Sequence, residues 1–222
     1  MSMRTKREAT PRQPVTRQRI LRAAIALADR SGIDAVTMRR VAQKLRIEAM
    51  SLYHHVADKE DMLDGMVDLI YTEIEVPVED DWKSALRHRA LSARRVLRRH
   101  RWALGLLDSR TTPAPATLRH HDQVIGLLRS ANFSLLMAAR AFALMDSYIY
   151  GFVIQELSLT FTNAEELADV AETILHDVPD DSYPNLAALT RAYVDTSAYD
   201  ADGDFAFGLD LILDGLAQPT RA

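Results

Sequence analysis

A short segment near the N-terminus gathers side chains that can contact a nucleic acid. It holds a hydroxyl at Ser51, a phenol at Tyr53, imidazoles at His54 and His55, and an ammonium group at Lys59. Such groups donate hydrogen bonds to phosphate oxygens and to base edges, and they are poorly suited to an apolar core. The segment therefore predicts contact with a polyanion.

Four helices are expected to position these side chains, because apolar residues recur at helical spacing between residues that cap helices. Their expected spans are a helix capped by Thr16 and closed by Ser31 and Gly32, a helix capped by Thr37 from Met38 to Leu45, a helix from Ala49 to Val56, and a helix from Asp58 to Glu73. Two short helices joined by a turn and braced by an earlier helix form a helix-turn-helix, whose second helix can lie in the DNA major groove.

The charge of the chain changes sign along its length. Residues 1–60 hold 13 Lys and Arg and 6 Asp and Glu, a net charge of +7, while the rest of the 222-residue chain has a net charge of -11. A basic first part predicts a polyanion partner for that part alone. The alternative is a basic segment that is simply solvated.

Two arginines stand at an unfavourable place in the first helix. Arg17 and Arg19 lie in its first turn, where positive charge opposes the helix dipole. An anion such as a DNA phosphate would relieve this cost. Alternatively, exposed arginines tolerate the small penalty without a partner.

Several segments together resemble a known family. They read TMRRVAQKL at 37–45, SLYHHV at 51–56 and DKEDML at 58–63. This combination is similar to the signature of TetR-family transcriptional regulators, and DFAFGLDLILDGL at 204–216 resembles the last helix of the tetracycline-repressor-like C-terminal domain. The resemblance implies an all-α fold, with a helix-turn-helix DNA-binding domain followed by a larger helical domain for ligand binding and dimerisation.

The resemblance also implies which residues contact DNA. The segment from Ala49 to His55 becomes the recognition helix, Lys59 becomes a phosphate contact, and Arg39 matches another contact position. With the residues chosen for their chemistry, the candidate DNA-binding residues are Arg17, Arg39, Ala49, Met50, Ser51, Tyr53, His54, His55 and Lys59. Ala49 and Met50 can read only apolar features such as a thymine methyl group.

One residue departs from the family pattern. Arg46 stands in the turn where many members have glycine. Either the left-handed backbone there is strained or replaced, or Arg46 itself contacts DNA.

The chain is expected to divide into a flexible basic arm at 1–15, a DNA-binding domain at 16–62 and a regulatory domain at 63–222. Longer helices are predicted in the last part, at residues 82–99, 103–108, 115–131, 135–159, 164–176, 185–196 and 205–217.

Two of these helices predict a homodimer. The helices from Leu135 to Leu159 and from Phe205 to Ala217 are apolar on more than one face, so both need burial on several sides. Two such helices from each of two chains can form a four-helix bundle, which suits a palindromic operator. The alternative is one large core in a monomer. A membrane span is not expected, because the first of these helices is interrupted by Arg140, Asp146, Gln155 and Glu156.

A small-molecule effector of unknown identity is expected in the regulatory domain, between helices 82–99, 115–131 and 135–159. The candidate ligand-binding residues are Trp102, Arg110, His121, Gln123, Met145, Asp146 and Tyr148. No metal or cofactor is expected, since His120 and His121 are adjacent on a helix and diverge. The tetracycline-type metal-binding histidine would fall at Leu107, so a tetracycline–magnesium effector is not expected.

The helix at 82–99 carries many arginines and no acid. The run comprises Arg87, Arg89, Arg94, Arg95, Arg98, Arg99 and, just beyond the helix, Arg101. A solvated helix with partners on nearby acidic helices is the preferred interpretation. An anionic effector or an additional DNA contact is the alternative.

Other function classes have less support. The chain has no Gly-rich phosphate loop, nucleophile elbow or cysteine, and the absence of cysteine fits a reducing cytoplasm. A small helical enzyme using His121 or Asp146, with the basic part as a docking arm, is one alternative. A non-specific nucleic-acid packaging protein is another. The favoured prediction is a cytoplasmic, dimeric repressor released from palindromic DNA by a small-molecule effector.

Overall fold

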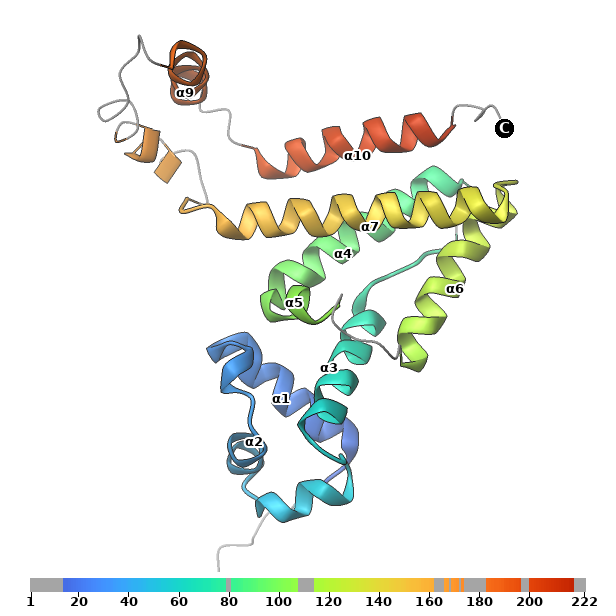
Figure 1. Cartoon of the computed structure of the whole chain (residues 1–222), viewed down its shortest axis with the longest axis vertical. Coiled ribbons are helices and arrows are strands. Elements are labelled where there is room, and N and C mark those ends of the chain that lie inside the picture. The colour runs from blue at the N-terminus through green and yellow to red at the C-terminus, as the bar shows by residue number, and fades with distance from the viewer. Residues whose placement is uncertain are drawn as a thin grey trace, which may run out of the picture.

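The structure is a computed structural model that describes residues 14–78, 81–107, 114–161, 166, 167, 169–171, 173, 183–196 and 200–217. Every regular element within these ranges is helical, as the sequence predicts. Most of the basic arm, Arg110 and most of the helix expected at 164–176 lie outside the described residues. Figure 1 shows a smaller group of helices at one end of the chain and longer helices at the other.

The smaller group begins as the cap residues predict. Helix α1 spans Arg17–Ser31 and α2 spans Met38–Leu45. The hydroxyls of Thr16 and Thr37 accept hydrogen bonds from backbone N–H groups three residues later, both at 3.2 Å. These caps satisfy N–H groups that have no partner inside the helix, so each helix starts where its threonine stands.

The recognition segment differs from its expected form. Residues Ala49–His54 make a 3-10 helix, η2, instead of an α-helix reaching Val56. Its start has no side-chain cap, and hydrogen bonds between residues three apart close it, including Ser51 N–H to the Glu48 carbonyl at 3.0 Å. Short uncapped segments commonly adopt this tighter winding. Leu52 and Val56 are nevertheless buried, as expected.

The turn before η2 adopts the conformation that glycine would favour. Arg46 ends α2 with φ 57° and ψ 47°, in the left-handed region, and its side chain is exposed. We expect Arg46→Gly to raise the free energy of unfolding by about 0.5–1 kcal/mol, because left-handed backbone costs a residue with a Cβ more than it costs glycine. Urea denaturation would measure it. Asn132→Gly, at φ 68°, should gain less because asparagine tolerates this region, and a loss of stability in Arg46→Gly would contradict the expected strain.

Helix α3 leaves the small group and enters the larger one. It spans Lys59–Glu73 and packs first on α1 and then on α6, which spans Pro115–Ser130. The Asp68 carboxylate on α3 accepts hydrogen bonds from the backbone N–H groups of Ala116 and Thr117, at 2.6 and 3.0 Å. The residue before α6, Ala114, has no side chain that could cap it. The first turn of α6 is therefore capped by a different helix.

The larger group is built around α4, α6 and α7. Helix α4 spans Trp82–Arg99 and is followed by the 3-10 turn η3 at Arg101–Ala103 and by α5 at Leu104–Leu107. Helix α7 spans Leu135–Ser158, and α9 spans Pro184–Thr196. These spans agree closely with the sequence expectation, apart from the η3 turn that shortens α5.

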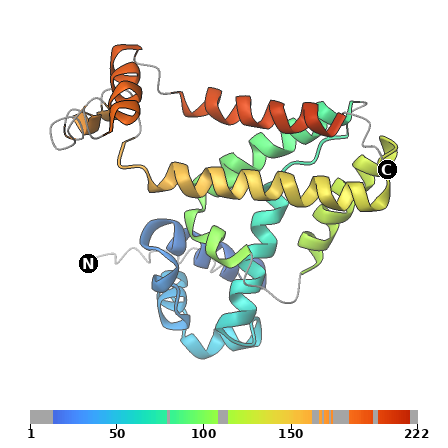
Figure 2. The same ribbon diagram turned by 45° about the horizontal axis from the view of Figure 1, so that its top comes forward.

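Helix α10 starts earlier than predicted. It spans Ala201–Ala217, whereas the expected helix began at Phe205. The Asp200 carboxylate accepts hydrogen bonds from the N–H groups of Asp202 and Gly203, at 3.1 and 2.9 Å. The acidic segment before Phe205 is thus the cap and first turn of the helix. Figures 1 and 2 show α7 and α10 side by side at the end away from α1 and α2.

Candidate functional site

The outer surface of the small helical group carries the side chains expected to contact DNA. Met50 and Tyr53 are 73% and 47% exposed, and His54, Arg39 and Lys59 are also exposed. The remaining candidates in this segment are half-buried, namely Ala49, Ser51 and His55. An exposed methionine at the tip of a short helix has no role in the core, and it provides an apolar surface of the kind that meets thymine methyl groups.

Arg17 has a different environment from the one expected. Its guanidinium forms a two-pronged ion pair with Asp61, with nitrogen–oxygen distances of 2.6 and 2.8 Å, and it donates to the carbonyl of His55 at 3.1 Å. The ion pair lowers the pKa of Asp61 and raises that of Arg17. The anion that relieves the start of α1 is therefore a carboxylate of the same chain. Arg17 connects α1, the end of η2 and α3, and thus supports the recognition segment from behind.

The arginines of α4 are bound to acidic residues, and two of them are buried. Arg94 is 4% exposed and forms hydrogen bonds with Glu156 on α7 at 2.7 and 3.0 Å and with Asp202 on α10 at 2.7 Å. Arg89 is 1% exposed. Partners on acidic helices were expected, but a solvated helix is wrong for these two positions. Further ion pairs join Arg87 to Asp210, Arg98 to Glu156 and Arg99 to Glu73.

Arg89 is at the centre of a polar cluster inside the larger group. One terminal nitrogen donates to Asp146 at 2.5 Å and the Nε donates to Nε2 of His120 at 3.2 Å. The other terminal nitrogen is buried and has no hydrogen-bond partner among the described residues. A buried N–H group without a partner is costly, so this atom is suited to an oxygen acceptor brought by a bound molecule.

Aromatic rings surround this cluster. The Tyr71 ring lies 5.3 Å from His120 and 5.6 Å from His121, and the Phe142 ring lies 4.9 Å from His121. Burial, together with the nearby Asp146 carboxylate, raises the pKa of Tyr150, whose hydroxyl lies 3.5 Å from that carboxylate. The cluster thus combines flat apolar surfaces with a few hydrogen-bonding groups, which is the usual composition of a small-molecule site.

His120 stays uncharged over most of the pH range. Burial, then the charge of Arg89, lowers its pKa to about 3. Because Nε2 accepts from Arg89, the proton of the neutral ring is on Nδ1. His120 also lines a pocket of about 210 Å³, whose other lining residues are Tyr71, Thr72, Ile74, Ala116, Arg119 and Gln123.

The low pKa of His120 predicts a loss of stability in acid. The unfolded chain takes up a proton below about pH 6.5, whereas the folded chain does so only near pH 3. We expect the free energy of unfolding to fall by up to about 1.4 kcal/mol per pH unit between these values. Urea denaturation of the wild type and of His120→Gln across this range would measure it. Equal slopes in the two proteins would show that His120 is not the cause.

The candidate ligand-binding residues are distributed over several places. His121 and Asp146 lie in the Arg89 cluster, Met145 is buried on α7, and Gln123 is exposed and lines the pocket of His120. Tyr148 lies against α10 instead, where its hydroxyl donates to the Phe205 carbonyl at 2.8 Å. Trp102 lies at the end of α4 facing α1, and Arg110 lies outside the described residues.

Sequence reasoning missed Arg89, His120, Tyr71, Tyr150 and Phe142 as members of this cluster. Spacing along α4 could not separate Arg89 from its neighbouring arginines, but an apolar helical face that includes an arginine is a signal for burial. No group of three His, Asp or Glu that could hold a metal ion occurs within the described ranges.

Comparison with known proteins shows the family to which this chain belongs. Residues 20–66 match the model of the bacterial regulatory proteins of the tetR family, and residues 76–219 match that of the tetracycline-repressor-like C-terminal domain. The chain belongs to the TetR family. Members of this family are DNA-binding transcriptional regulators that respond to ligands. The exposed tip, formed by Met50, Tyr53 and His54, therefore lies in the DNA-binding part, and the Arg89 cluster lies in the ligand-binding part.

Individual TetR-family relatives support the assignment over most of the chain. The repressor DrrR1 of Streptomyces coeruleorubidus is 31% identical over 93% of this chain and 78% of its own length. The class A tetracycline repressor of Escherichia coli is 30% identical over 94% and 92%. Among solved structures, ActR of Streptomyces coelicolor in complex with actinorhodin is 30% identical, covers 92% of this chain and 97% of its own, and superposes with a TM-score of 0.75.

Proposed function

We propose that the protein represses transcription as a homodimer bound to an inverted-repeat operator, and that a small-molecule effector releases it. The observation that carries this proposal is the exposed tip formed by Met50, Tyr53 and His54, supported from behind by the Arg17–Asp61 ion pair. We further propose that it acts in the cytoplasm and has no catalytic activity. In this proposal residues 1–15 form the arm, 16–62 the DNA-binding domain and 63–222 the regulatory domain.

The proposed DNA contacts have separate tasks. Met50, with Ala49 and Ser51 beside it, reads base edges, while Lys59 and Arg39 bind phosphates. Tyr53, His54 and His55 supply hydrogen bonds to either. Arg17 is proposed to position the recognition segment and not to contact DNA, because its guanidinium forms an ion pair with Asp61.

The dimer is supported by apolar side chains that a single chain leaves exposed on α7 and α10. They are Leu135, Leu136, Leu144, Ile154, Phe207 and Leu211. By length and composition α7 could also cross a membrane, and only 28% of its most apolar window is buried within one chain. Its carboxylates Asp146 and Glu156 are bound to Arg89 and Arg94 on α4, which favours a helix packed within the protein.

The effector is proposed to bind at the Arg89 cluster. The uncompensated N–H of Arg89 and the rings of Tyr71, His121 and Phe142 favour a molecule with a flat apolar body and an oxygen acceptor. The solved ActR complex contains actinorhodin, which makes that compound the first probe to test.

Selection from a random DNA pool tests the proposal. We expect an enriched inverted repeat, a dimer by light scattering, and loss of the dimer in Leu136→Glu/Leu211→Glu. Leu118→Glu, at an exposed leucine on α6, is the matched control that should remain dimeric. DNA retained without sequence enrichment, and lost with added salt, would contradict a specific regulator. Release of the selected operator by actinorhodin would identify one effector.

A further inference from the structure

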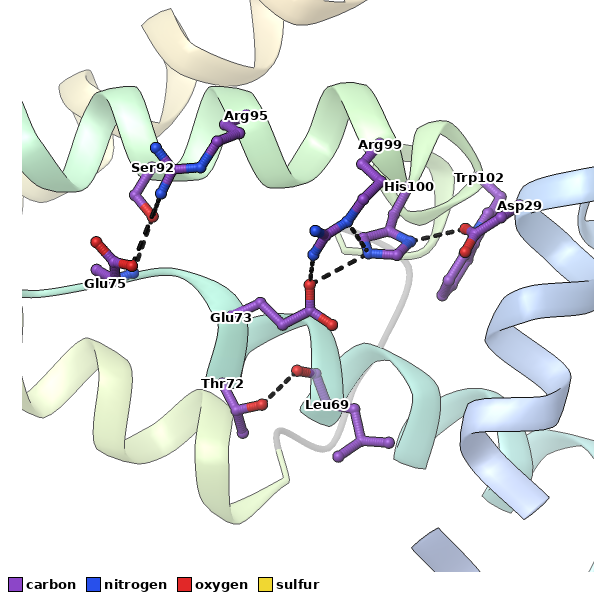
Figure 3. A network of polar contacts seen from close by, with 10 residues as sticks. All are labelled: Asp29, Leu69, Thr72, Glu73, Glu75, Ser92, Arg95, Arg99, His100 and Trp102. Atoms are coloured by element: carbon purple, nitrogen blue, oxygen red, sulfur yellow. Dashed lines mark hydrogen bonds and ion pairs between the residues drawn. The ribbon is translucent and has the colours of Figure 1, made fainter. Parts of the chain in front are cut away.

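A polar cluster joins the two halves of the protein at the end of α4 (Figure 3). Asp29, in the last turn of α1, accepts a hydrogen bond from Nε1 of Trp102 at 2.7 Å on its Oδ1. Nδ1 of His100 lies 2.7 Å from the same oxygen. His100 and Trp102 come from the segment that follows α4, so this contact links the DNA-binding half to the ligand-binding half. We refer to Asp29, His100 and Trp102 as the clasp.

Side-chain contacts extend the clasp to the ends of α3 and α4. Because the Asp29 carboxylate can only accept, Nδ1 of His100 donates to it. The Nε of Arg99 lies 3.0 Å from Nε2 of His100, and Oε2 of Glu73 lies 3.3 Å from the same nitrogen. The same guanidinium is bound to Glu73 at the end of α3. The ends of α1, α3 and α4 are thereby connected through side chains (Figure 3).

Burial makes the clasp costly to open. His100 is 4% exposed and Trp102 is 9% exposed. If α1 moved away, both donors would lose the oxygen that they share. Buried donors without acceptors are unfavourable, so the contact resists separation of the two halves.

Helices α1 and α3 of the DNA-binding half are closely connected, so we expect this half to move as one piece. Arg17 pairs with Asp61 and joins α1 to the start of α3, and a Cβ on Gly65 would come within 2.8 Å of Leu21, which shows how closely the two helices pack. The half is attached to the rest of the protein covalently through α3 and non-covalently through the clasp on α1. If α3 were the only attachment, the DNA-binding half could rotate about it. A second attachment at a separate point fixes the angle between the DNA-binding half and the rest of the protein.

We infer that Asp29, His100 and Trp102 are positioning residues that hold the DNA-binding half at the angle required for operator binding. The inference rests on the proposed function. Through the clasp, a displacement of α4 reaches α1 directly, in addition to the route along α3. None of the three residues contacts DNA in this proposal.

Replacement of Asp29 by alanine tests the inference. We expect Asp29→Ala to bind the selected operator at least five-fold more weakly than Asp34→Ala, which removes the same charge from an exposed position of the same half. Loss of an acidic residue from the last turn of α1 favours that helix, so weaker binding would not arise from its unfolding. Asp29→Asn keeps an acceptor for Trp102 and should recover part of the affinity. Equal affinities of Asp29→Ala and Asp34→Ala would overturn the inference.

Trp102 fluorescence provides a readout that requires neither DNA nor a dimer. The chain has two tryptophans, so Trp82→Phe leaves Trp102 as the single reporter. In that background Asp29→Ala should increase quenching by acrylamide, whereas Asp34→Ala should not. Unchanged quenching would show that the clasp does not hold the two halves together. If no operator is enriched, the proposed function fails, and the quenching comparison still decides whether the clasp exists.

Discussion

Replacing Tyr53 and Lys59 by alanine is expected to weaken operator binding by about 100-fold. Each side chain is exposed on the DNA-binding half, and a contact of this kind contributes about 1–3 kcal/mol. The two changes lie outside the core, so folding should be unaffected. Fluorescence anisotropy with the selected operator would measure the affinity at several salt concentrations. Loss of the Lys59 phosphate contact in both protomers should also reduce the salt dependence of binding by about two units of slope.

The control for this experiment is Tyr183→Ala/Lys83→Ala. Tyr183 is 58% exposed beside α9, and Lys83 is on α4, so the same residue types are removed away from the tip. This variant should bind the operator like the wild type. If both double variants bind equally well, the tip at η2 is not the DNA-binding surface.

Removal of Asp146 is expected to have the largest effect on stability. Asp146→Ala leaves the guanidinium of Arg89 buried without its counter-charge, and breaking a buried ion pair in this way typically costs about 3–5 kcal/mol. Tyr150 loses a carboxylate acceptor at the same time. Urea denaturation monitored by circular dichroism would give the change in the free energy of unfolding.

Two further variants identify the cause. Asp214→Ala breaks the pair with Lys83, in which Asp214 is 74% exposed, and should change the stability far less than Asp146→Ala does. Arg89→Met/Asp146→Leu removes both buried charges and should recover most of the loss. A single variant Asp146→Ala as stable as Asp214→Ala would mean that the buried charge is compensated in another way.

The parts of this fold that depend on neighbouring residues could be predicted from the sequence. Thr16 and Thr37 cap helices through hydrogen bonds that reach three residues along the chain, so the starts of α1 and α2 could be read directly. Asp200 caps α10 in the same local way, so the sequence also holds the signal for a helix that starts before Phe205. The likeness of 37–63 to TetR-family regulators indicated the family, which the comparison confirms.

The parts that depend on distant partners could not be predicted in this way. Arg17 and Asp61 are 44 positions apart, and Arg94 reaches Asp202 over 108 positions. Charge patterns describe an arginine as basic, but only the fold decides whether a carboxylate replaces water around it. For the same reason the Arg89 cluster combines residues from α3, α4, α6 and α7 that no local motif unites.

The start of α6 is capped by Asp68 of α3, so the first turn of α6 depends on the orientation of α3. When Asp68 faces Ala116 and Thr117, two N–H groups at the start of α6 are satisfied. If α3 turned, both groups would have to find water together, because one carboxylate oxygen serves them both. The start of α6 would then tend to unwind as α3 rotates, so the protein should occupy two distinct states with few intermediate angles between them.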